Sequence, residues 1–144
     1  MVKKILNYEV SSGETNMNIS LAGVAESDGL YFLALRKPGT SIGESWEFPG
    51  GKAEKGETHQ QTLIREYMEE FSVKIIVGNR ILKSSFRNKN RDFVLYAYNI
   101  TIMSEIIEMP EHQECGWFSL DQQKNLKMAY SDKIIFKHLE NNII

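Results

Sequence analysis

The sequence has little cysteine and no long apolar run, and each shortage excludes a class of protein. Its 144 residues include one cysteine, Cys115, which can form neither an internal disulfide nor a cysteine-based zinc cluster. The longest apolar runs, residues 30–35 and 93–98, are far shorter than the ~20 residues of a membrane-spanning helix. Residues 1–10 also lack the apolar core of a signal peptide. We therefore expect a cytoplasmic protein with no membrane partner.

The chain also lacks an excess of either charge, with 17 Lys and Arg against 19 Asp and Glu. This balance excludes a strongly basic protein that grips nucleic acid through its phosphates, so we expect no stable nucleic-acid complex. A small phosphorylated ligand could still bind through local charge. Because the sequence contains no repeat, low-complexity stretch or linker, we expect a single domain over residues 1–144.

Hydrophobic periodicity predicts a β-rich chain with two helices, hence a mixed α/β fold. The strands are expected at 17–25, 30–37, 46–48, 74–87, 92–103 and 115–120, and the helices at 58–71 and 131–141. The Asp28-Gly29 step and the polar cluster 88–90 predict two hairpin turns. A further turn is expected at 49–51, and Ser131 and Asp132 are both candidates for the N-cap of the last helix.

Three glutamates lie on one face of the helix predicted at 58–71. Glu66, Glu69 and Glu70 are spaced at i, i+3 and i+4, where like charges cost a few tenths of a kcal/mol per pair. A divalent cation would reverse that sign, and Mg²⁺ binds carboxylates while sharing its other positions with phosphate oxygens. Taken alone, the trio could equally be a solvated acidic face.

The context of these glutamates closely resembles the signature of Nudix hydrolases, and its flanks resemble the MutT-like branch. The resemblance is carried by the segments WEFPGGK (46–52), GET (56–58), REYMEE (65–70) and EHQECGWF (111–118). It implies an α/β/α sandwich with a mixed β-sheet, one catalytic helix and a C-terminal helix. Ser72 replaces the glycine of the motif, where a left-handed backbone is usual, and should cost about 1 kcal/mol. We expect the helix to end slightly differently there, with the carboxylates still in register.

The resemblance also implies a metal site for Mg²⁺ or Mn²⁺. Its expected ligands are the carboxylates of Glu66, Glu69 and Glu70, the carbonyl of Gly50, and either Glu111 or Glu114. Strand alternation would place Glu111 and Glu114 on opposite faces, which leaves the choice open. Glu57 and Arg65 resemble the ion pair that braces the loop against the helix, with direct catalysis by Glu57 as the alternative. Glu66 is the first candidate for the general base and Glu70 the second.

Three residues resemble substrate-binding positions of the MutT-like branch. Arg36 would meet a substrate phosphate, unless it is a plain surface arginine. Phe48 and Asp132 would lie near the base, with core packing and helix capping as their alternatives. The histidines lack mutual metal-ligand spacing and are expected on the surface or in loops: His59, His112 and His138. We expect Cys115 to be a buried thiol without a nucleophilic role.

The implied activity is attack of water on a nucleoside triphosphate, which yields nucleoside monophosphate and pyrophosphate. Oxidised, noncanonical or cytidine nucleotides are the substrates we consider first. A second possibility is another pyrophosphate, such as a nucleotide sugar, a dinucleoside polyphosphate or an RNA 5′ end. A third is a nucleotide-sensing module without catalysis, although such modules usually lack some of the carboxylates retained here. The sequence leaves the preferred base open, and the protein could be a monomer or a homodimer.

Overall fold

The structure is a computed structural model that describes residues 18–39 and 43–142. The expectations about residues 1–10 and about residue 17 as a strand start lie outside this part of the chain. The described elements, in chain order, are β1 (Asn18–Ser27), β2 (Leu30–Arg36), β3 (Trp46–Glu47), β4 (Gly50–Lys52), α1 (His59–Phe71), β5 (Ile75–Asn88), β6 (Arg91–Ile102), β7 (His112–Phe118), α2 (Leu120–Gln123) and α3 (Tyr130–Asn141). No helix among them is long and apolar enough to cross a membrane.

Both predicted hairpin turns are confirmed, and the backbone explains why. Between β1 and β2, Asp28 and Gly29 have positive φ angles of 52° and 81°. Between β5 and β6, Lys89 and Asn90 have φ angles of 52° and 63°. Two successive left-handed residues give the type I′ turn, whose twist matches that of the flanking strands.

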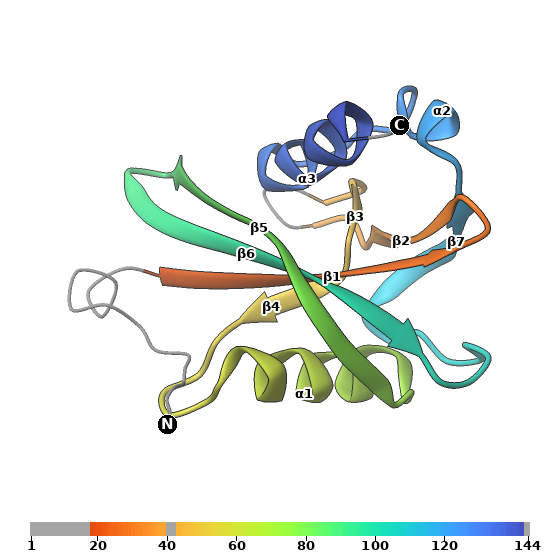
Figure 1. The fold of residues 1–144 in the computed structure, drawn as a ribbon, viewed down its shortest axis with the longest axis horizontal. Coiled ribbons are helices and arrows are strands. Elements are labelled where there is room, and N and C mark those ends of the chain that lie inside the picture. Colours follow the sequence, from red (N-terminus) through yellow and green to blue (C-terminus); the bar gives the residue numbers. More distant parts are fainter. Residues whose placement is uncertain (1–17, 40–42, 143–144) are drawn as a thin grey trace.

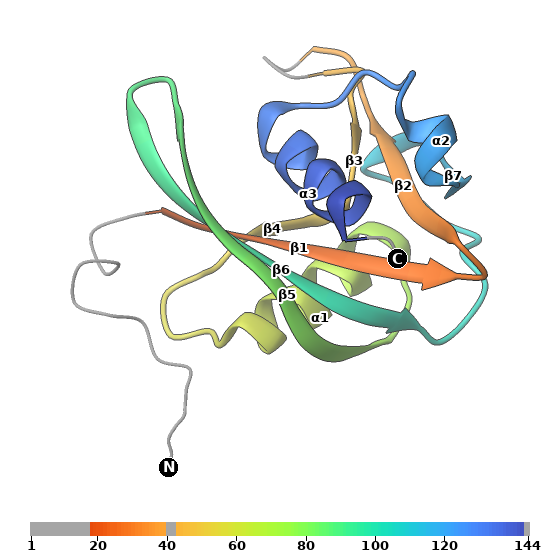
Figure 2. The ribbon, with the colours of Figure 1, turned by 45° about the horizontal axis from the view of Figure 1, so that its top comes forward.

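The sheet is mixed and carries helices on both faces. Strand β1 pairs in parallel with β6 and antiparallel with β4, while β2 pairs antiparallel with β1, β3 and β7. Helix α1 covers one face, and α3 and α2 lie on the other side (Figures 1 and 2). Two apolar clusters fill the layers: Leu63, Tyr67 and Phe71 of α1 belong to the first, and Ile135 and Phe136 of α3 to the second. The predicted α/β/α sandwich is confirmed.

Helix α1 is fixed at both ends by its own sequence. Thr58 is the N-cap: its side chain accepts a hydrogen bond from the Gln61 amide, and the Gln61 side chain accepts one from the Thr58 amide. At the other end Ser72 adopts the left-handed conformation that favours glycine, with φ 54° and ψ 36°. The buried stripe is narrower than the periodicity suggested, because Ile64 and Met68 are exposed.

The expected turn at 49–51 is wrong, because Gly50 and Gly51 lie in strand β4. They pair with Ala22 and Leu21 of β1, and a Cβ on Gly50 would collide with the Leu21 carbonyl. Glycine therefore serves here to bring two backbones together. This close pairing places β4 in the sheet beside β1, where it also contacts α1.

The C-terminal third also departs from the prediction. Strand β7 begins at His112, three residues earlier than expected, and the short helix α2, capped by Ser119, was not predicted. Helix α3 begins after Ala129, whose side chain forms no capping hydrogen bond. Neither Ser131 nor Asp132 is the N-cap, because both lie inside the helix.

Candidate active site

The acidic helix α1 lies directly against β4. A Cβ on Gly51 would overlap the carboxylate of Glu66 in its present position, so glycine leaves room for that side chain. The Tyr67 hydroxyl, buried beneath, donates to the carbonyl of Pro49 at 3.0 Å. A buried hydrogen bond therefore ties the WEFPGGK segment to the glutamate helix, and the small size of Gly51 lets the two pack closely.

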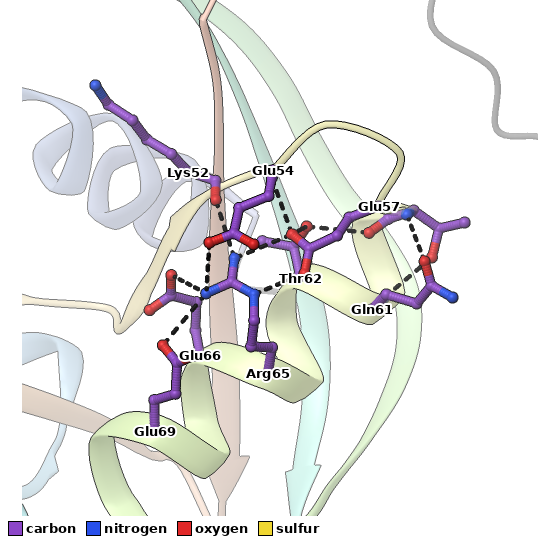
Figure 3. Close-up of polar contacts among 9 residues, drawn as sticks. Lys52, Glu54, Glu57, Gln61, Thr62, Arg65, Glu66 and Glu69 are labelled. Carbon is purple, nitrogen blue, oxygen red and sulfur yellow. Dashed lines mark hydrogen bonds and ion pairs between the residues drawn. The ribbon is translucent and has the colours of Figure 1, made fainter.

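Arg65 is the centre of a carboxylate network beside β4 (Figure 3). Its Nε donates to Glu57 Oε2 at 2.6 Å and its Nη2 to Glu57 Oε1 at 3.0 Å. Its Nη1 donates to Glu66 at 3.0 Å and to Glu69 at 3.3 Å. The Arg65 hydrogen bonds hold the pKa of Glu57 at about 2, below its ordinary 4.5. The structure thus contains the expected Glu57–Arg65 ion pair, and both Glu57 oxygens are engaged in it.

The three helix glutamates have unequal surroundings. The Glu69 side chain is 57% exposed and turns toward Arg65, whereas Glu66 lies under Arg65 with 16% exposure. Glu70 is buried, and its Oε1 has no hydrogen-bond partner within the described residues. Burial, reinforced by Glu66 and Glu47, raises the pKa of Glu70 to about 10. A cation beside Glu70 would relieve both the desolvation and the repulsion.

Two residues that the sequence analysis did not assign to the site, Glu47 and His112, complete this cluster. His112 Nε2 lies 2.6 Å from Glu47 Oε2 and 3.8 Å from Glu70 Oε1. The imidazole is buried and stacks on Phe71, with ring centroids 5.2 Å apart and an interplanar angle of 13°. The prediction that His112 is a surface or loop residue is therefore wrong.

Of the other two histidines, His59 also contradicts the prediction of a surface or loop position, whereas His138 stays partly exposed on a helix. His59 is buried, with its Nδ1 2.8 Å from the Tyr98 hydroxyl. His138 is partly buried within α3. Cys115 is partly buried, and burial raises the pKa of its thiol, which disfavours the nucleophilic thiolate.

Of the two candidates for the closing carboxylate, the structure brings one to the site. Glu111 lines a cavity of about 340 Å³ together with Gly50, Glu70 and His112. Glu114 is exposed, pairs with Leu35 across the sheet, and does not line that cavity. Strand alternation does not account for this separation, because Glu111 lies in the turn before β7, which begins at His112.

The three expected substrate-binding residues line one cavity of about 280 Å³: Arg36, Phe48 and Asp132. Its walls are partly apolar, formed by Phe86, Phe93 and Leu95. Asp132 Oδ1 accepts a hydrogen bond from the Phe48 amide at 3.0 Å, so its alternative role as a helix cap is wrong. Burial, with Glu47 nearby, raises the pKa of Asp132 well above its ordinary range.

The two cavities adjoin. Arg36, Glu47 and Gly50 line both of them, and Arg36 Nη1 donates to Glu47 Oε1 at 3.0 Å. One cavity offers apolar walls and a buried carboxyl, and the other offers carboxylates, a histidine and basic residues. The donor set of the second, with the unpaired oxygen of Glu70, fits a divalent cation.

This combination defines a class of protein: an α/β/α sandwich with an acidic helix beside a cavity wide enough for a small ligand. Comparison with known sequences gives the family. The model of the NUDIX domain matches residues 17–139. The chain belongs to the Nudix family and is a MutT-like hydrolase that acts on phosphoanhydride bonds.

Individual relatives agree with this assignment. The chain is 30% identical over 112 residues to the CTP pyrophosphohydrolase of Escherichia coli, covering 78% of this chain and 83% of that protein. It is 31% identical over 100 residues to the 8-oxo-dGTP diphosphatase of Haemophilus influenzae, covering 67% and 71% of the two. The solution structure of the E. coli ORF135 protein superimposes with a TM-score of 0.78 at 26% identity, covering 92% of this chain and 94% of that one.

Proposed function

We propose that this protein is a nucleoside triphosphate pyrophosphohydrolase that releases nucleoside monophosphate and pyrophosphate. The observation that carries the proposal is the pair of adjoining cavities joined by Arg36, Glu47 and Gly50. The partly apolar cavity suits a base and the acidic cavity suits a metal-bound triphosphate. The relatives named CTP pyrophosphohydrolase and 8-oxo-dGTP diphosphatase support this reading.

The acidic cavity would hold Mg²⁺ or Mn²⁺. The proposed ligands are the carboxylates of Glu66, Glu69, Glu70 and Glu111 and the carbonyl of Gly50. Of these, Gly50, Glu70 and Glu111 line the acidic cavity, whereas Glu66 and Glu69 lie outside its lining. The bound ion would neutralise charge on the phosphoryl oxygens and lower the pKa of the attacking water. Glu69 is the least favourably placed of the carboxylates, because its side chain is exposed and bonded to Arg65.

The protein side chains would then position the substrate and move one proton. Arg36, which lines both cavities, would bind a phosphate between base and metal. Either Glu66 or Glu70 would take the proton of the attacking water. The two Arg65 hydrogen bonds to Glu57 leave that residue as a brace for Arg65, which in turn holds Glu66.

At the base end, Asp132 and Phe48 are the proposed selectivity residues. One Asp132 oxygen is used by the Phe48 amide, which leaves the second oxygen for a polar edge of the base. Phe86 and Phe93 line the same cavity, as does Phe48, which is buried in the second apolar cluster. We propose oxidised or noncanonical nucleotides, or cytidine nucleotides, as the preferred substrates.

A hydrolysis screen tests the proposal. Canonical and oxidised nucleoside triphosphates, with nucleotide sugars, dinucleoside polyphosphates and capped RNA, would be incubated with Mg²⁺ or Mn²⁺ and the products identified. We expect monophosphate and pyrophosphate from a triphosphate, and severe loss of kcat in Glu66→Gln and Glu70→Gln. Tight nucleotide binding with no turnover of any substrate would instead indicate a sensing module.

A further inference from the structure

One buried cluster joins three elements at the floor of the acidic cavity. Glu47 comes from β3, Glu70 from α1 and His112 from β7, and one ligand atom from each lies within 4.8 Å of the other two. All three side chains line the same cavity. The His112 and Glu70 side chains are only 3% and 11% exposed, so bulk water does little to satisfy them.

One carboxylate oxygen of the cluster lacks a hydrogen-bond partner among the described residues. Glu70 Oε1 is buried and receives no hydrogen bond from any described residue. His112 Nε2 is 3.8 Å from this oxygen and already lies 2.6 Å from Glu47. A buried acceptor without a partner is costly, and a cation between these groups would satisfy it.

The neighbours of His112 fix the orientation of its ring. Stacking on Phe71 holds the ring plane, and Nε2 is the nitrogen that faces the two carboxylates. Arg36 already binds the second oxygen of Glu47, so Glu47 keeps a charged partner if its bond to His112 is exchanged. Coordination through the Nε2 lone pair would place the ring proton on Nδ1, which is buried without a hydrogen-bond partner among the described residues.

We propose that His112 is a ligand of the divalent ion through Nε2, beside Glu70 and Glu47, so that the site contains a nitrogen among its oxygens. This inference rests on the proposed function and specifies its metal. Mg²⁺ strongly prefers oxygen ligands, whereas imidazole suits transition metals. The protein should therefore bind Mn²⁺ or Co²⁺ more tightly than an all-oxygen site would, relative to Mg²⁺.

Pulsed electron paramagnetic resonance of the Mn²⁺-loaded full chain tests the ligand directly. With natural-abundance histidine, ¹⁴N modulation from a coordinated imidazole is expected, and ¹⁵N-histidine labelling should replace it with the ¹⁵N pattern. The signal should be lost in His112→Gln and retained in His138→Gln, a histidine of α3 outside the cavity. The labelling arm needs no variant, so an absent nitrogen signal overturns the inference even if His112→Gln folds poorly.

Binding titrations give the second readout. His112→Gln should weaken Mn²⁺ binding by roughly tenfold or more, and Mg²⁺ binding by less. Wild-type protein that binds Mn²⁺ tightly and hydrolyses nucleotides without any nitrogen modulation would overturn the inference and leave the proposed function intact. Wild-type protein that binds neither Mn²⁺ nor Mg²⁺ would overturn both.

Discussion

Replacing Glu70 with glutamine should stabilise the metal-free protein while removing its activity. Glu70 is buried beside Glu47 and Glu66, and these surroundings raise its pKa from an ordinary 4.5 to about 10. The folded protein must therefore bind a proton that the unfolded chain releases at neutral pH. Glutamine has nearly the same shape and no such requirement, so it removes this cost of folding.

The sign and size follow from proton linkage. A raised carboxyl pKa costs nothing below the unfolded value of 4.5, and the cost grows as pH rises toward the folded value of about 10. Each pH unit in that window corresponds to about 1.4 kcal/mol. Because structural relaxation around the buried carboxyl reduces the cost, we expect a gain of about 2–3 kcal/mol at pH 7.5. For a chain of this length that raises the Tm by roughly 5–10 °C.

The assay is thermal unfolding of wild type and Glu70→Gln in EDTA between pH 4.5 and 8.5, followed by nucleotide hydrolysis with metal added. Glu69→Gln is the matched control, because it removes the same charge one residue earlier from a side chain that is 57% exposed. Added Mn²⁺ should raise the Tm of wild type more than that of Glu70→Gln. A Tm difference that stays constant or shrinks with rising pH would refute the argument, and so would full activity in Glu70→Gln.

Three other results are expected. Glu57→Gln should make the free energy of unfolding depend less on pH below 4.5. The Arg65 bond that lowers the Glu57 pKa to about 2 stabilises the fold above pH 4.5, and this stabilisation is lost as pH falls toward 2. Unchanged acid unfolding would contradict this. In urea unfolding, Ser72→Gly should be about 1 kcal/mol more stable than Ser72→Ala, because only glycine relieves the left-handed backbone, while both lose the 2.9 Å bond to Glu108. Asp132→Asn keeps the acceptor for the Phe48 amide, so it should fold normally and show an altered base preference in kcat/KM. Asp132→Ala should in addition lower the free energy of unfolding by about 1 kcal/mol. An identical substrate profile in Asp132→Asn would contradict this.

Local patterns in the sequence were sufficient for much of the fold. The Asp28-Gly29 turn needs only its own two residues to favour a left-handed backbone, and the Thr58 cap needs only Gln61 three positions later. The spacing of Glu66 and Glu70 likewise follows from helix geometry alone. These elements were predictable because the interactions that form them lie within a few residues along the chain.

The missed features depend on pairings between distant segments. Gly50 and Gly51 read as a turn until β1 is placed beside them. The β2 register sets Arg36 opposite His112 and Ala34 opposite Glu47. Glu47 and His112, which are 65 positions apart in the sequence, therefore come into contact across β2. Nothing in the local sequence of His112 distinguishes it from an exposed loop histidine.

That same pairing explains why the site can be both polar and buried. Strand β2 carries Arg36 between the strands that supply Glu47 and His112, so the sheet itself brings a cation, an anion and an imidazole together under the glutamate helix. Arg36 neutralises one oxygen of Glu47, and His112 lies against the other. Glu70 then enters from α1 with one oxygen, Oε1, that no described residue hydrogen-bonds. Of the three helix glutamates only Glu70 lines this cavity. The sheet register supplies Glu47 and His112, the residues that we propose discriminate between metals.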